Sequence, residues 1–587
     1  MALQQRVFSL ETEYAINFFP AGGPGSPPEQ AIVQALQEAI NPAYGLHGSL
    51  FLVNGGKLHH DLGHAEWSLP ECRSAYEATV YNKAADHVLG QAAAEATAIL
   101  SRSGFRGDLL VIKNNVDSVG VTYGCHENYQ TLRDAEFLPD LPEQRHFLRY
   151  MVRCLVPFLA TRQVFAGAGR LVLEAQPGPP CLRFEISQRA RFIDRVVSKE
   201  TTRERPIVNL GREGEPHASG NSRRLHLILG DANLSGWATW LKLGTTGVLL
   251  RMIEDLSLTD LPLLQNPVAA LATIAADPDC RAMVSLKDGR QASALDIQWH
   301  YYEQAYSYLE HFGSNDDERR VMEEWGQALQ DLDNDPSLLR DRADWAAKRY
   351  LMERSLREHG LTLDEAASHP EALRALQHID LLYHDIGPAG LFTQLWPVDT
   401  LVSAAEIEAA RRAPPFSRAL LRGATIELGR RGLATVNVQE WSSVSIDNTT
   451  YHLPAPLAFD LQLLPEAARA VALPWLQQAY QHPDPLVRQQ AMRAAGPAPV
   501  EQLPGLAAIA RSDPSLPVRI AAVEALAASG LPEAGDLLLP LLGTPEAGLR
   551  WAVEAALSHL THAIRGEPVP ASPESPVTRE GLVQMIG

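Results

Sequence analysis

Apolar residues along the first 130 positions follow two spacings, one typical of strands and one typical of helices. Alternation of apolar and polar residues predicts strands over 6–17, 50–61 and 108–114. Apolar residues three and four positions apart predict helices over 29–40 and 74–101. This part of the chain is therefore expected to form a sheet that is packed against helices.

The pattern changes further along the chain. A helix is expected over 141–165, arginine-bearing strands after residue 170, and a helix over 234–254. Helical spacing then dominates over 294–383. A small mixed region follows over 400–460, and it includes a strand-like alternation at 441–447.

Beyond residue 463 the chain is rich in Ala, Leu and Pro at helical spacing, and three similar units recur. Each unit has a proline at its start and an arginine a few residues later: Arg488, Arg519 and Arg550, 31 residues apart. A fixed period with small packing residues predicts stacked helical hairpins similar to HEAT repeats, with the arginines bridging neighbouring helices. The Pro/Ser-rich stretch 567–576 is expected to be a mobile tail.

The composition of the chain argues against some classes of function. The chain has 587 residues, of which 45% are hydrophobic and 21% charged, as in a folded protein of two or more domains. The formal net charge of −19 argues against a nucleic-acid partner, which needs a basic face. No stretch reaches the roughly 18 apolar residues of a membrane span, and no signal peptide opens the chain. We therefore expect no membrane partner and a cytoplasmic location.

The candidate chemistry lies in a cluster of carboxylates and imidazoles at 57–71, with the sequence KLHHDLGHAEWSLPE. A second acidic pair, Glu11 and Glu13, lies in the first predicted strand and shares one face of it. Several carboxylates on one face repel one another unless cations bind them. Oxygen ligands with an occasional imidazole suit Mg²⁺ or Mn²⁺. The alternative is a solvated acidic edge strand.

Several longer segments then follow in a fixed order along the chain. They are KNNVD at 113–117, YGCHENY at 123–129, SQR at 187–189, TTRERPIVN at 201–209, EPH at 215–217, RRLH at 223–226 and GDANL at 230–234. Over residues 6–456 the chain resembles the family of Pup ligases and Pup deamidases/depupylases. That family is related in fold to the glutamine synthetase-type carboxylate–amine ligases.

The resemblance implies an α+β fold: a glutamine synthetase-like antiparallel sheet packed with helices, then a small C-terminal α/β domain, then α-helical HEAT-like repeats. The corresponding domain ranges are 1–400 for catalysis, 401–460 for the small domain, 461–566 for the repeats and 567–587 for the tail. The implied activity transfers the γ-phosphate of ATP to a carboxylate, which an amine or water then attacks. The implied cofactors are ATP and Mg²⁺, with Mn²⁺ as the alternative.

The resemblance also assigns roles to residues. Asp61 matches the catalytic aspartate. The metal ligands would be Glu11, Glu66 and His226, together with His59, which stands where the family has a tyrosine. The candidates for nucleotide binding are Arg189, Arg205, Arg223, Arg224, Asn128 and Trp441. The alternatives are surface ion pairs for the arginines, a core histidine for His226 and a core side chain for Trp441.

The direction of the reaction is left open between two branches of the family. The deamidase/depupylase branch has a long loop between its first two strands, and the space at 18–49 leaves no room for it. This favours a ligase that joins the terminal glutamate of a small Pup-like modifier to lysines of target proteins. A hydrolase of the modifier or its conjugates, a divergent member acting on another modifier, and a scaffold are the alternatives. The repeats would bind a protein or pack on the catalytic domain.

Overall fold

The computed structural model describes residues 5–21, 25–46, 50–61, 63–117, 120–132, 145–174, 180–209, 222–396, 401–453, 455–494 and 496–565. Parts of the predicted loop at 21–28 and the start of the predicted helix at 141–165 lie outside these ranges. The EPH segment at 215–217 and the tail at 567–587 also lie outside them. The chain forms two units, Met1–Leu457 and Ala458–Gly587, and each is described by itself. The four predicted domain ranges stay predictions.

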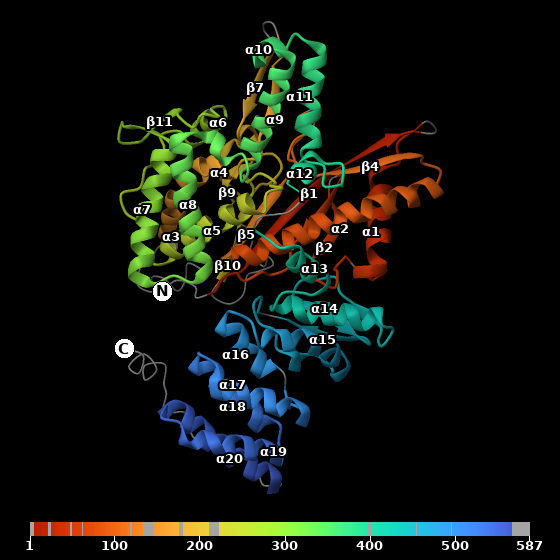
Figure 1. Cartoon of the computed structure of the whole chain (residues 1–587), viewed down its shortest axis with the longest axis vertical. Coiled ribbons are helices and arrows are strands. Elements are labelled where there is room, and N and C mark those ends of the chain that lie inside the picture. Colours follow the sequence, from red (N-terminus) through yellow and green to blue (C-terminus); the bar gives the residue numbers. More distant parts are fainter. Residues whose placement is uncertain are drawn as a thin grey trace. The chain divides into compact units, whose positions relative to one another are not determined.

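An eight-stranded sheet forms the centre of the first unit (Figure 1). Its strand order is β2-β3-β1-β5-β10-β9-β8, and β4 pairs with the far end of β1. The described pairs are antiparallel except for β8 and β9. In chain order the strands are β1 (Phe8–Pro20), β2 (Lys57–Asp61), β3 (His64–Ser68), β4 (Gly107–Ile112), β5 (Cys125–Leu132), β8 (Arg195–Ser198), β9 (Pro206–Asn209) and β10 (Ser222–Leu227).

Helices make up most of the rest of the first unit. They are α1 (Glu29–Tyr44), α2 (Ala75–Arg102), α3 (Arg145–Thr161), α4 (Gln163–Ala166), α5 (Gly236–Glu254), α6 (Pro267–Ala275), α7 (Ala294–Phe312), α8 (Asp316–Asn334), α9 (Asp344–His359), α10 (Leu363–Ala366), α11 (Pro370–Leu382), α12 (Leu391–Leu395), α13 (Ala404–Arg412) and α14 (Arg418–Arg430). Smaller sheets are formed by β6 (Arg170–Glu174) with β7 (Cys181–Glu185), by β11 (Met283–Ser285) with β12 (Gln291–Ser293), and by β13 (Val436–Asn437), β14 (Ser443–Ile446) and β15 (Thr449–His452). The α+β prediction is confirmed.

The two faces of the large sheet differ because side chains alternate along each strand. One face carries apolar residues such as Leu10, Trp67 and Tyr129, which are fully buried. Helices α2 and α5 cover this face: the Tyr14 hydroxyl donates to Asp86 of α2 over 2.8 Å, and Thr131 donates to Glu254 of α5 over 2.9 Å. The other face carries the polar residues of the same strands.

Local sequence explains where the main elements begin and end. Helix α2 begins after Ser74, whose hydroxyl accepts the Glu77 amide hydrogen over 3.0 Å as an N-cap. The predicted strand at 50–61 is wrong in its first half, since only β2 is a strand. Gly55 adopts a φ of +82° and its amide donates to the Leu52 carbonyl, so the chain turns before β2 begins. Among the described helices, none is both long and apolar enough to cross a membrane.

The second unit is a stack of helices (blue in Figure 1): α15 (Glu466–Ala479), α16 (Pro485–Ala494), α17 (Leu503–Ser512), α18 (Leu516–Ala528), α19 (Pro532–Leu538) and α20 (Ala547–Arg565). The arginine of one repeat binds a carboxylate at the start of the next. Arg488 donates two parallel hydrogen bonds to Asp513, of 2.8 and 2.9 Å, and Arg519 pairs with Glu546. The predicted bridging role of these two arginines is confirmed.

A buried carboxylate joins the 401–457 segment to the large sheet within the first unit. Glu71 follows β3, and its oxygens accept hydrogen bonds from Arg418 over 2.6 Å and from Arg422 over 2.5 and 3.0 Å. The three side chains are at most 3% exposed. Two guanidinium groups that face one carboxylate in the interior depend on that carboxylate for their charge balance.

We expect Glu71→Ala to destabilise the protein by about 3–5 kcal/mol, because it leaves two buried guanidinium groups without their anion. Thermal unfolding of the purified protein measures the effect. Glu204→Ala is the control, since Glu204 pairs with Arg195 at 54% exposure on both sides and exposed pairs contribute only about 0–1 kcal/mol. Equal unfolding temperatures for the two variants would contradict the importance of the Glu71 ion pairs.

Candidate functional site

The polar face of the large sheet gathers the predicted site residues from five neighbouring strands. Residues directly opposite one another in an antiparallel pair share a face. The register pairs Asp61 with His64, His59 and Glu13 with Glu66, Glu11 with His126, and Asn128 with His226. Since Arg224 lies two residues before His226 on β10, it also belongs to this face. We call this set of residues the polar face: Glu11, Glu13, His59, Asp61, His64, Glu66, His126, Asn128, Arg224 and His226.

Three side chains of the polar face converge on one point. Glu11, His126 and His226 each offer a ligand atom, and these atoms lie within 4.8 Å of one another. The His126 Nδ1 atom is 3.7 Å from Glu11 Oε2, and the two imidazole centroids are 4.9 Å apart. One carboxylate with two imidazoles is a set of ligands that a divalent metal ion binds.

His126 was missed as a candidate ligand in the sequence, although it lies within the YGCHENY segment. The missing information was the pairing of β5 with β1, which places His126 opposite Glu11. Strand alternation alone predicts which residues of β5 share a face, but not which strand lies beside β5.

The remaining carboxylates of the polar face also lie beside imidazoles. His64 Nδ1 is 3.6 Å from Glu13, and His59 Nε2 is 3.6 Å from Glu66. The distance between His126 Nε2 and Glu13 is 3.9 Å. Positive charge is therefore available next to each of these carboxylates when the imidazoles are protonated or when a cation binds.

The charges of the polar face shift the pKa of two glutamates in opposite directions. Burial, together with the neighbouring carboxylates of Glu11, Glu13 and Asp61, raises the pKa of Glu66 to about 9. Burial would also raise the pKa of Glu11, but Arg224 and the two histidines outweigh it and hold that pKa well below its usual value. The polar face thus carries more negative groups than its own cations balance.

Asn128 and Arg224 connect the ligand cluster to its surroundings. The Asn128 Oδ1 atom is 2.7 Å from His226 Nδ1, a contact that fixes the orientation of the imidazole. One guanidinium nitrogen of Arg224 lies 3.2 Å from Glu11 Oε1, and the other terminal nitrogen lies 3.1 Å from His226 Nδ1. The Nδ2 atom of Asn128 is buried and has no hydrogen-bond partner among the described residues, so it can donate to a bound anion.

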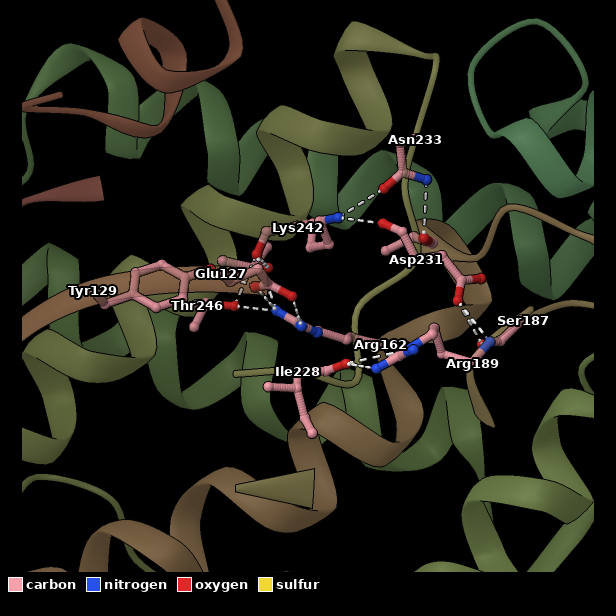
Figure 2. A network of polar contacts seen from close by, with 12 residues as sticks. Glu127, Tyr129, Arg162, Ser187, Arg189, Ile228, Asp231, Asn233, Lys242 and Thr246 are labelled. Carbon is pink, nitrogen blue, oxygen red and sulfur yellow. Dashed lines mark hydrogen bonds and ion pairs between the residues drawn. The ribbon is translucent and has the colours of Figure 1, made fainter. Parts of the chain in front are cut away.

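The other candidate arginines occupy different surroundings. Arg189 is 1% exposed, and its guanidinium donates to Thr122 and to the carbonyls of Tyr123 and Ile228, as Figure 2 shows for Ile228. Burial and the nearby charge of Arg205 lower the pKa of Arg189 to about 10. Arg205 is half-buried, and within the described part of the chain its guanidinium has no hydrogen-bond or ion-pair partner.

Arg223 does not join the polar face. It pairs with Thr131 on the face that the helices cover, because successive residues of β10 point to opposite sides. Its role in nucleotide binding stays a prediction, as do the roles of the other candidates.

Trp441 lies beside an aromatic and a basic side chain, Phe51 and Arg422. Its ring meets the Phe51 ring edge-on, with centroids 5.0 Å apart. The Arg422 guanidinium lies 4.9 Å from the Trp441 ring and 5.2 Å from the Phe51 ring. Lys57, which lies 5.9 Å from the Phe51 centroid, precedes His59 by two residues and adds a cation that sequence reasoning missed.

The donor atoms of the polar face fit a divalent cation. Carboxylate oxygens are the preferred ligands of Mg²⁺, and imidazoles add affinity for Mn²⁺ and softer ions. The buried Nδ1 atoms of His59 and His64 have no hydrogen-bond partner among the described residues. The residues that would hold the ion are Glu11, His126 and His226, with Glu66 and His59 on the adjacent strands.

The chain thus has an α+β fold with a candidate metal site on one side of a mostly antiparallel sheet. A model of the Pup-ligase protein family matches residues 6–445, and a model of HEAT repeats matches residues 473–558. The chain belongs to the Pup-ligase protein family.

Its relatives include both branches of this family. A Pup–protein ligase of Acidimicrobium ferrooxidans is 37% identical over 455 residues, which span 76% of this chain and 94% of the relative. A Pup–protein ligase of Actinosynnema mirum is 36% identical over 72% of this chain and 89% of its own length. A depupylase of Acidothermus cellulolyticus is 37% identical over 68% of this chain and 75% of its own length.

Two solved structures are also similar. The ligase PafA in complex with the prokaryotic ubiquitin-like protein Pup has a TM-score of 0.68 and 30% identity, and the match covers 82% of this chain and 95% of that one. PafA in complex with ADP has a TM-score of 0.62 and 31% identity, with coverage of 78% and 95%.

We expect Glu11→Ala to weaken Mn²⁺ binding by more than about tenfold, because losing even an outer-shell partner typically costs 10–100-fold in affinity. Isothermal calorimetry or the Mn²⁺ electron paramagnetic resonance signal measures this. Glu310→Ala, on the exposed surface of α7, is the control. Unchanged Mn²⁺ affinity in Glu11→Ala would remove Glu11 from the metal site.

Proposed function

We propose that the protein is an ATP-dependent ligase that joins the side-chain carboxylate of the terminal glutamate of a Pup-like modifier to lysine amines of target proteins. The observation that carries this proposal is the polar face itself, on which Asp61 shares one side of the sheet with the candidate metal ligands. Family membership and two Pup–protein ligases at 36–37% identity support it.

The reaction has two steps. The γ-phosphoryl group of ATP moves to the glutamate carboxylate of the modifier, which gives ADP and an acyl phosphate. The lysine nitrogen then attacks the acyl carbon, the C–O bond to phosphate breaks, and an isopeptide bond forms. The amine must lose a proton in this step, and Asp61 is the residue proposed to accept it.

Asp61 is well situated for this role. It ends β2 beside the tight turn at Gly63, whose φ is +99°, and it is partly exposed. A base at the rim of the polar face is accessible to the lysine of a second protein, while a fully buried carboxylate would not be. The hydrogen-bonded register of β2 with β3 holds it in place.

A bound Mg²⁺ or Mn²⁺ would neutralise charge on the transferred phosphoryl group. Glu11, His126, His226 and Glu66 would hold it. Arg205, Arg224 and Asn128 would donate to phosphate oxygens, and Trp441 with Lys57 would line the nucleotide site. The relative PafA with bound ADP supports nucleotide use by this chain.

A hydrolase of the modifier or of its conjugates is the second candidate function. The depupylase relative, 37% identical, favours it. Against it, the described residues between β1 and β2 contain α1 and short connections, as expected for a chain without the long loop of the depupylase branch. We propose a cytoplasmic location, and we propose that the second unit binds a protein or packs on the first.

We expect Asp61→Asn to lower the rate of conjugation by about 10²–10⁴-fold, because the side chain keeps its shape but loses its basicity. ATP affinity should change far less than turnover. Conjugation rates and ATP titrations test this, with Asp108→Asn on the exposed side of β4 as the control. Turnover of Asp61→Asn at the wild-type rate would show that Asp61 is not the base.

Incubation with Pup ending in glutamate, a lysine-bearing target protein and Mg·ATP should give a conjugate whose mass is the sum of both proteins less one water. ADP and phosphate should appear in equal amounts with it. Intact-mass spectrometry and phosphate release measure this. Release of free Pup from a preformed conjugate, with no forward product, would support the hydrolase instead.

A further inference from the structure

Lysine is scarce in this chain and unevenly placed. The sequence contains seven lysines and 44 arginines, and the last lysine is at position 348. The second unit, Ala458–Gly587, therefore contains none. All seven lysines lie in the described ranges: Lys57, Lys83, Lys113, Lys199, Lys242, Lys287 and Lys348.

Four of these lysines are buried, and each donates hydrogen bonds to the protein itself. Their exposed fractions are 8% or less. The shortest bonds to oxygen run from Lys83 to the Leu234 carbonyl over 2.8 Å, from Lys113 to Asp86 over 2.8 Å, from Lys242 to the Asp231 carbonyl over 2.7 Å (Figure 2) and from Lys348 to the Gly169 carbonyl over 2.7 Å. An amine held in this way cannot meet an acyl phosphate without local unfolding.

The remaining three lysines differ in access. Lys57 is half-buried on β2, two residues before His59, and its amine lies 5.9 Å from the centre of the Phe51 ring. Lys199 is exposed immediately after β8, and Lys287 is exposed in the turn between β11 and β12. Only these last two amines combine exposure with a position outside the site.

An enzyme that activates a carboxylate for attack by amines presents its own lysines to that intermediate at high effective concentration. Arginine does not accept the acyl group, because its guanidinium stays protonated and its lone pairs are delocalised. The ion pairs that join the repeats, Arg488 with Asp513 and Arg519 with Glu546, use arginine throughout.

We infer that the chain is protected from its own activity: self-modification is confined to Lys199 and Lys287, and the lysine-free second unit is inert. This inference rests on the proposed ligase function. In the step concerned, the lysine nitrogen bonds to the acyl carbon of the activated modifier, phosphate leaves, and the amine loses one proton.

The test incubates the full-length protein with Pup ending in glutamate and Mg·ATP, without another protein, and maps the conjugates by mass spectrometry. We expect conjugates at Lys199 and Lys287. The double variant Lys199→Arg/Lys287→Arg should form at least about tenfold less self-conjugate than the wild type. Its activity on added casein should stay unchanged. Adding Arg511→Lys, an exposed position of α17, should restore a conjugate at that position.

Self-conjugates at Lys57 or at any of the four buried lysines would overturn the inference. So would undiminished self-conjugation in the double variant, failure of Arg511→Lys to restore it, or no self-conjugate in a wild type that modifies casein. Absence of casein conjugates as well would contradict the proposed function instead.

Chemical acetylation tests the burial of the lysines without using enzyme activity. It therefore distinguishes failure of this inference from failure of the proposed ligase function. Brief treatment with an acetyl N-hydroxysuccinimide ester should acetylate Lys199 and Lys287 at least about tenfold faster than the four buried lysines. Equal acetylation of all seven would overturn the protection by burial, whatever reaction the enzyme catalyses.

Discussion

Electrostatic repulsion among the carboxylates of one sheet face is the constraint on which the site depends. Glu11, Glu13, Glu66 and Asp61 lie on three adjacent strands, where like charges destabilise one another. Burial and this repulsion together raise the pKa of Glu66. Arg224 and the imidazoles lie beside these carboxylates and compensate for part of the repulsion, and the remaining negative charge supports the proposal that a divalent ion and, through it, phosphate bind here.

The opposite face of the sheet supplies the rigidity that such a site needs. Helices α2 and α5 bury its apolar side chains, and buried ion pairs cross between elements, such as Arg162 with Glu127 on β5 (Figure 2). Glu127 and His126 are neighbours on one strand and point to opposite sides. Packing behind the sheet thus holds the candidate ligands in front of it, an arrangement that suits a preorganised site.

Much of this could be predicted from local patterns. Strand alternation places Glu11 and Glu13 on one face, and helical spacing predicts a helix at 74–101, close to the observed α2. The position of His126 opposite Glu11 could not be predicted, because strand order is a property of the whole sheet. The adjacent pair of arginines on β10 shows the same limit: alternation sends Arg223 and Arg224 to opposite faces, but only the fold tells which face is polar. The roles proposed for the other site residues depend on the resemblance to the family.

The most direct test of this account is the position of the cation and the nucleotide in a crystal of the protein grown with Mn²⁺ and ADP. The account predicts an anomalous difference peak at bonding distance from Glu11 and from a histidine of the pair His126 and His226. The ADP phosphates should lie on the same face of the sheet, beside Arg224. A Mn²⁺ ion bound away from these ligands, or ADP on the helix-covered side near Arg223, would contradict it.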